Sequence, residues 1–116
     1  MARTYLFFHP SRLPLAAEEL DEVTVTPLPD NAALREALAL AFSGIEWSTP
    51  HHARAQVGGD WVELLVPQDA ADTLSLRGSL RVDHTALIQG LCERFGWLAF
   101  DERPYCYQRG REPMPV

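Results

Sequence analysis

The chain of 116 residues contains no lysine, so all ten of its positively charged side chains belong to arginine. A Walker-type nucleotide loop needs a lysine that reaches the phosphates, and nucleotide hydrolysis of that type is therefore excluded. Sixteen carboxylates outnumber the arginines and give a net charge of −6. Because a general binder of phosphate backbones needs a positive surface, this balance disfavours nucleic acid as a partner. We interpret the missing lysine as the biased composition of a bacterial genome.

Cysteines and long apolar runs are also scarce. Of the two cysteines, Cys92 falls on an expected helix and Cys106 on an expected strand, which predicts reduced, buried thiols rather than a disulfide framework. The first nine residues contain a hydrophobic run of only four, shorter than the apolar region of a signal peptide. No apolar segment reaches the roughly 20 residues that a membrane span needs. We therefore expect a cytoplasmic protein with no membrane association.

Motifs that carry chemistry are missing as well. His51 and His52 come nearest to a metal site, but adjacent residues of a strand point to opposite faces, and no third ligand follows at a recognisable spacing. No serine lies in a Gly-x-Ser-x-Gly elbow. Asp83 would place a carboxylate where a dinucleotide phosphate should bind, and His84 beside it is expected to be exposed or to cap a helix. We expect no metal and no cofactor, and we lean away from an enzyme.

The sequence does have the composition of an ordinary globular protein, with 47% hydrophobic and 22% charged residues. Its length is sufficient for one core and too short for two. We therefore predict a single α+β domain over residues 1–109, followed by a short mobile tail over residues 110–116.

Two helical segments have clear boundaries. Asp30 is placed to cap a helix over residues 31–43, and Asp83 begins a second helix that ends at Gly96. The segments that begin at these two aspartates align without a gap, either because one unit was duplicated or because capped helices rich in alanine and leucine resemble each other. The first helix is apolar around most of its circumference, which predicts burial on more than one side or a partner.

A β-hairpin is the best-determined local structure. Gly58 and Gly59 link two strand-like runs and are typical of a two-residue turn. The register that places Arg54 opposite Glu63 also places apolar residues opposite one another on the other side of the hairpin. A slip of one residue would destroy both matches, so the pattern specifies this register.

The remaining strand-like runs complete the order β-β-α-β-β-β-β-α-β-β. These runs cover residues 4–9, 23–26, 45–47, 73–77, 97–100 and 105–109. Two strand-helix-strand units with right-handed crossovers would place both helices on one face of a mixed or antiparallel sheet. The predicted fold is therefore α+β, a split β-α-β or ferredoxin-like arrangement that two related units would form.

Two surfaces are candidates for recognition. The hairpin register assigns Trp61 and Leu65, together with Arg54, to the face opposite the helices. This composition is typical of an interaction hot spot, unless a loop or a neighbouring strand covers Trp61. Tyr105 and Tyr107 form an alternative, because they share one face of a strand near several arginines, and aromatic side chains on a sheet stack with single-stranded RNA bases.

These observations favour a non-enzymatic module that pairs with another protein or with itself. The contact would be made through the open sheet face or the apolar surface of the first helix. Size and acidity agree with an immunity or adaptor protein that neutralises a more basic partner. The alternative is a domain that binds a small ligand or single-stranded nucleic acid on an aromatic sheet face.

Overall fold

The computed structural model describes residues 2–11, 25–28, 30–57, 60–67, 73–79, 83–102 and 105–115. Its strands are β1 (Ala2–Pro10), β2 (Val25–Thr26), β3 (Glu46–Thr49), β4 (His52–Val57), β5 (Asp60–Leu65), β6 (Thr73–Ser79), β7 (Leu98–Asp101), β8 (Tyr105–Gln108) and β9 (Arg111–Pro115). The two helices are α1 (Asn31–Ala41) and α2 (Thr85–Phe95).

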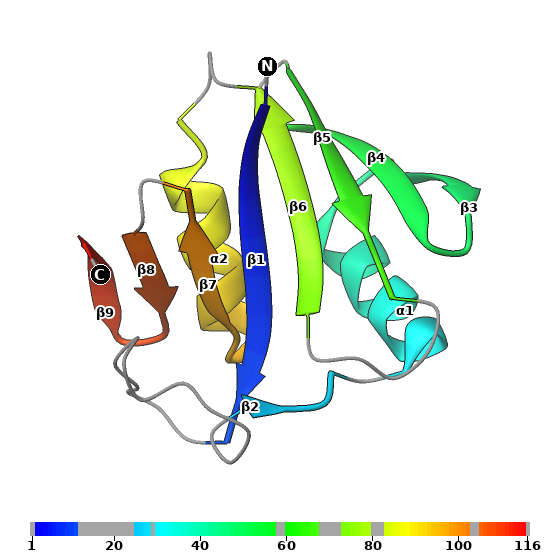
Figure 1. Ribbon diagram of the computed structural model, residues 1–116. Helices are drawn as coiled ribbons and strands as arrows, with labels where there is room; N and C mark the ends of the chain where they lie inside the picture. Colours follow the sequence, from blue (N-terminus) through cyan, green and yellow to red (C-terminus); the bar gives the residue numbers. More distant parts are fainter. Residues whose placement is uncertain are drawn as a thin grey trace.

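Eight of the strands follow one another across the sheet in the order β3-β4-β5-β6-β1-β7-β8-β9, and β2 pairs with the end of β1. All of these pairs are antiparallel. Consecutive strands build both ends of the sheet, β3 to β6 on one side of β1 and β7 to β9 on the other (Figure 1). The first strand of the chain thus lies in the middle of the sheet.

The expected ferredoxin-like arrangement is wrong. The described residues form mostly an antiparallel sheet with two short helices, and these helices do not belong to equivalent units. Helix α1 connects β2, which lies outside the main strand order, to the edge strand β3, whereas α2 connects β6 to β7. The physical reason is that most consecutive strands are neighbours, and a short connection between neighbouring strands reverses the chain and makes them antiparallel.

The register predicted for the hairpin of β4 and β5 is confirmed. Arg54 lies opposite Glu63, and Gln56 lies opposite Trp61. Both alanines of β4 are fully buried on the other side of the sheet. The glycine pair at residues 58–59 lies outside the described residues, so the expected turn type stays a prediction.

Two of the predicted helix ends are confirmed, whereas α1 ends at Ala41 instead of residue 43 and the N-cap residue of α2 is His84 instead of Asp83. The carboxylate of Asp30 accepts a hydrogen bond of 2.9 Å from the backbone N–H of Ala33, which confirms the N-cap of α1. Gly96 ends α2 in the left-handed region with φ of 71°, and its N–H donates to the carbonyl of Cys92. Within the described part of the chain, no helix is long and apolar enough to cross a membrane.

One face of the sheet supplies the core. Side chains that alternate along the strands pack there with residues of both helices in a single cluster. Its largest fully buried members are Tyr5, Phe7, Leu34, Leu38, Leu64, Leu74, Leu76, Ile88 and Tyr107. A second, small cluster consists of Leu98 and Cys106 with Phe100 packed against them.

The segment expected to be a mobile tail contains a strand. Arg111–Pro115 forms β9, which pairs with β8. The turn before it is bound to α2, because Arg109 Nε donates to the carbonyl of Glu93 (2.9 Å) and the N–H of Gly110 donates to its carboxylate (3.1 Å). The bond from Gly110, followed by one from Gln89, lowers the pKa of Glu93 below its ordinary value.

Candidate functional site on the open sheet face

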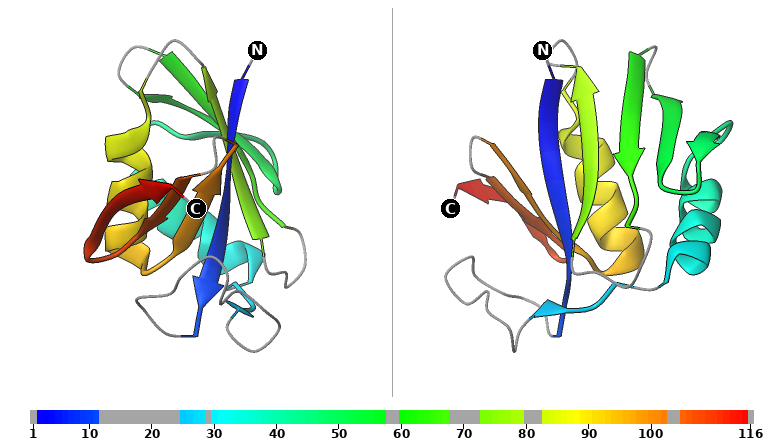
Figure 2. Two further views of the ribbon diagram at one scale, coloured as in Figure 1. Left: turned by 60° about the vertical axis from the view of Figure 1, so that its left-hand side comes forward. Right: turned by 45° about the vertical axis from the view of Figure 1, so that its right-hand side comes forward.

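Exposed apolar side chains gather on the side of the sheet that faces away from the core. In Figures 1 and 2 both helices lie on the other side, so the strands themselves form this surface. The described residues expose five large hydrophobic side chains, Leu6, Leu40, Trp61, Leu65 and Met114. All except Leu40 lie on this surface, with exposed fractions of 39% to 50%. We call this surface, which carries Leu6, Trp61, Leu65 and Met114, the open face.

The strand register arranges much of this apolar area in one row. Leu65 lies opposite Ser75, which lies opposite Leu6 on the next strand. Leu6 in turn lies opposite Phe100, and the row continues through β8 to Met114. This row places Leu65, Leu6, Phe100 and Met114 on one side of the sheet, but the polar Ser75 and the buried Cys106 interrupt its apolar surface. Monomeric proteins rarely expose large contiguous apolar areas, and such areas mark docking surfaces.

Trp61 is the largest side chain of the open face, and an arginine lies against it. The guanidinium carbon of Arg54 is 4.9 Å from the centre of the Trp61 ring, within the range of a cation–π interaction. Tryptophan and arginine are the residues most enriched among interaction hot spots. The structure thus brings Arg54 and Trp61 together, and Leu65 lies on the same side of β5, four residues further along the strand.

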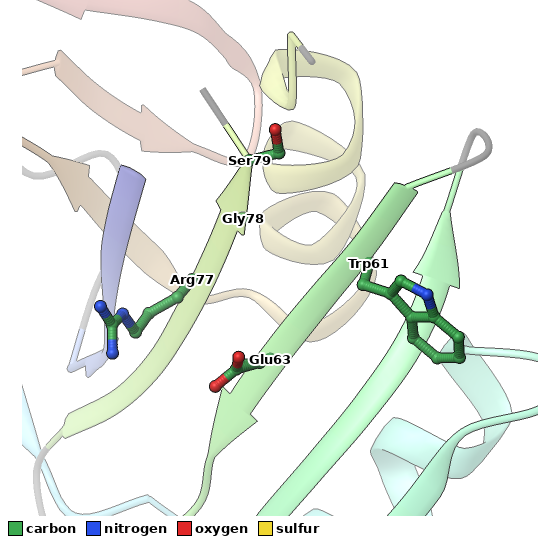
Figure 3. A pocket seen from close by; sticks show the side chains of 5 residues that line it. All are labelled: Trp61, Glu63, Arg77, Gly78 and Ser79. Carbon is green, nitrogen blue, oxygen red and sulfur yellow. The ribbon is translucent and has the colours of Figure 1, made fainter. Parts of the chain in front are cut away.

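Among the described residues, two shallow hollows are lined by side chains of the open face. The first has a volume of about 160 Å³ and is lined by Trp61, Glu63, Arg77, Gly78 and Ser79. In Figure 3 the side chains of Trp61 and Arg77 extend away from each other, and Glu63 lies between them. The second hollow, of about 370 Å³, is lined by Thr4, Leu6, Phe100, Asp101 and Glu102. Both fit the protruding side chains of a partner better than a ligand that needs enclosure.

A serine, a histidine and a glutamate form a hydrogen-bonded chain at one end of the open face. Ser48 Oγ lies 2.7 Å from His52 Nδ1, and His52 Nε2 lies 3.3 Å from a carboxylate oxygen of Glu63. Hydrolases use these three groups, but they also need oxyanion donors and a pocket that excludes water. Ser48 is exposed and lines neither hollow. We therefore interpret the chain as a network that orients Glu63.

The two tyrosines of the alternative site are not on the open face. Tyr107 is fully buried in the core, where its hydroxyl donates a hydrogen bond of 3.0 Å to the carboxylate of Asp101. Tyr105 shares the core side of β8 and is partly buried. The alternation along the strand correctly predicted that Tyr105 and Tyr107 lie on the same face of β8. That face is the one that packs into the core. Neither ring therefore forms part of an exposed stacking platform.

Helix α1 offers a second apolar surface. Only Leu34 and Leu38 are fully buried among its residues, whereas Leu40 is 72% exposed. Of the two expectations for this helix, burial on more than one side is therefore wrong, and a partner stays a prediction. A groove of about 280 Å³ lies between the helices and is lined by Ala41, Ala86, Leu87, Gly90, Leu91 and Arg94.

Sequence reasoning missed several residues of the open face. Leu6, Glu63 and Arg77 belong to it, but only Glu63 could be placed from the hairpin register. The alternation along β1 assigns Leu6 and Tyr5 to opposite faces without saying which face is covered. That information requires the strand order, which places β1 beside β6 and β7.

Among the described residues, no group of three or more His, Cys, Asp or Glu is placed to hold a metal ion. The protein was also compared with known families, curated proteins and solved structures. No protein-family model, curated protein or solved structure matches this chain.

Proposed function

We propose that this protein is a non-enzymatic interaction module that docks a protein partner on the open face. The observation that carries the proposal is the clustering of exposed large hydrophobic side chains, four of the five in the described residues, on one side of one sheet. A scattered set of such residues would be ordinary, because apolar atoms contribute much of any protein surface. Their position on one side of the sheet, beside Trp61, supports docking instead.

The side chains around Trp61 support the same conclusion. The indole is held against Arg54, so little side-chain entropy remains to be lost when a partner covers it. Polar groups surround it, namely His52, Gln56 and Glu63 on the same side of β4 and β5. An aromatic anchor within a polar rim is the usual anatomy of a protein interface.

The test compares the wild-type chain with Trp61→Ala and Leu40→Ala. Both substitutions remove an exposed apolar side chain, one from the open face and one from α1. Sedimentation velocity measures self-association, and capture on the immobilised chain measures binding of a second protein. We expect Trp61→Ala to weaken the association at least roughly tenfold, as hot-spot truncations do, and Leu40→Ala to leave it unchanged.

Three outcomes would contradict the proposal. The first is association that survives Trp61→Ala, and the second is association lost in Leu40→Ala alone, which would assign docking to α1. The third is a wild-type protein that binds neither itself nor another protein. Urea unfolding of both variants provides the control, since substitutions of exposed residues usually change the free energy of unfolding by no more than about 0.5 kcal/mol.

Stacking of nucleic-acid bases on an aromatic face is not part of the proposal. Tyr107 is enclosed in the core, and the exposed Trp61 lies beside Glu63 and within a chain whose net charge is −6. A binder of single strands needs a positively charged groove along its stacking platform.

A further inference from the structure

Charged residues of alternating sign cross the open face in one row. Glu46 of β3 lies opposite Arg54 of β4, and Arg54 lies opposite Glu63 of β5. Glu63 in turn lies opposite Arg77 of β6. The four strands are consecutive neighbours in the sheet, so the row reads acid, base, acid, base. Residues that are directly opposite in a sheet share one face, which puts all four side chains on the same surface.

The two arginines of this row have no carboxylate partner among the described residues. The guanidinium of Arg54 lies over Trp61, and Glu63 lies within hydrogen-bond distance of His52 Nε2, at 3.3 Å. Figure 3 shows the side chain of Arg77 directed away from Glu63. The row therefore presents charges that are not neutralised within it.

We propose that the partner on the open face is a second copy of this chain, related by a two-fold axis that runs parallel to the strands between β4 and β5. This inference rests on the proposed function. Such an axis reverses the order of the row, so acid, base, acid, base meets base, acid, base, acid. Arg54 then meets the partner's Glu63, and Glu46 meets the partner's Arg77. A two-fold axis along the row would instead bring equal charges together.

The same axis places the apolar side chains of β5 inside the contact. Trp61 and Leu65 precede and follow Glu63 by two residues, so they lie in the rows on either side of the charged one. Burial of these side chains supplies affinity, and the ion pairs fix the register, because charge pairs at interfaces contribute more to specificity than to affinity. Two sheets packed face to face in this way form an aligned sandwich.

The contact is confined to four short strands, and small interfaces are typical of weak, transient complexes. We therefore expect a weak dimer that weakens further as salt screens the charge pairs. Sedimentation velocity over a range of concentrations shows a monomer–dimer equilibrium that shifts towards monomer at high salt.

Two single variants test the register, Arg54→Glu and Glu63→Arg. Within each chain, positions 54 and 63 then carry the same sign. Each variant alone also brings like charges together across the two-fold axis, and its dimer weakens at least roughly tenfold. When the two variants are mixed, position 54 of each copy faces an opposite charge at position 63 of the other. The mixture therefore forms a heterodimer of nearly wild-type affinity.

Recovery in the mixture supports the inference, because mixing leaves every contact within a chain unchanged. The mixture can instead fail to form the heterodimer although the wild-type chain dimerises and the Trp61→Ala chain does not. This result overturns the two-fold register and leaves the proposed function intact. A wild-type chain that stays monomeric but captures another protein through Trp61 overturns the second copy as partner. If either variant fails to fold, the pair Glu46→Arg and Arg77→Glu tests the same axis at its outer contacts.

Discussion

The imidazole of His84 lies directly against the backbone of Gly78. A Cβ added at position 78 would come within 2.7 Å of His84 Cε1 and closer still to Nε2. The ring cannot easily retreat, because Nε2 donates a hydrogen bond of 2.9 Å to the carbonyl of Ser79 and the side chain is buried. Tyr5 meets the same ring edge-on at 6.1 Å. This contact connects the end of β6, beside the hollow near Trp61, to the start of α2.

Substitution of Gly78 by alanine should therefore destabilise the fold. The added methyl group must displace a buried ring or the strand, and overpacking of this kind costs about 1–3 kcal/mol. Urea unfolding followed by circular dichroism measures the change. Gly90→Ala is the matched control, because nothing lies within 4 Å of a Cβ at this exposed helical position. There, alanine should stabilise by about 0.5–1 kcal/mol. Equal stability of the two variants would contradict the packing described for His84.

The surroundings of His84 could not be predicted from the sequence. The sequence placed His84 in the first turn of the second helix, exposed or capping, but it is the N-cap residue that precedes α2, its side chain makes no capping hydrogen bond, and it is buried. The carboxylate of Asp83, one residue earlier, instead accepts a hydrogen bond from the backbone N–H of Thr85 at the start of the helix. A local pattern can place a residue at a helix start, but only the path of β6 puts Gly78 beneath the ring.

The buried carboxylate of Asp101 yields a second prediction. It accepts hydrogen bonds from the hydroxyl of Tyr107 (3.0 Å) and from the backbone N–H of Tyr105 (2.8 Å). Tyr107→Phe should lower the free energy of unfolding by about 1–3 kcal/mol, because a buried acceptor loses a donor. The double variant Tyr107→Phe with Asp101→Ala should cost less than the sum of the single changes, since the carboxylate that lost a donor is then absent. Strict additivity in the urea-unfolding cycle would show that the bond contributes nothing.

Cys92 predicts a dependence of stability on alkaline pH. Burial, followed by the charges of Cys106 and Glu93, raises the pKa of its thiol from 9.0 to about 12. A group whose pKa is raised in the folded state stabilises the fold below its unfolded pKa and loses this contribution as pH rises. The advantage of the wild-type chain over Cys92→Ala in urea unfolding should therefore shrink between pH 9 and about pH 12. An advantage that grows with pH would contradict this placement of the thiol.

The strengths and errors of the sequence prediction have a common physical origin. Local rules held where a pattern is self-contained, as in the cap at Asp30 and in the pairing of Arg54 with Glu63. They failed for the strand order, because β1 pairs with strands far along the chain and nothing in its own residues specifies them. The error over Tyr107 has the same cause. Alternation showed that Tyr105 and Tyr107 share a face, but only the complete sheet shows that the helices cover it.

Association of two copies through the open face is the central claim, and a concentration series of amide NMR spectra tests it most directly. As the wild-type chain is concentrated from dilute solution, we predict that the signals of Arg54, Glu63, Leu65 and the indole N–H of Trp61 shift together, while those around Leu40 remain fixed. Shifts confined to Leu40 and the groove between the helices would contradict the claim.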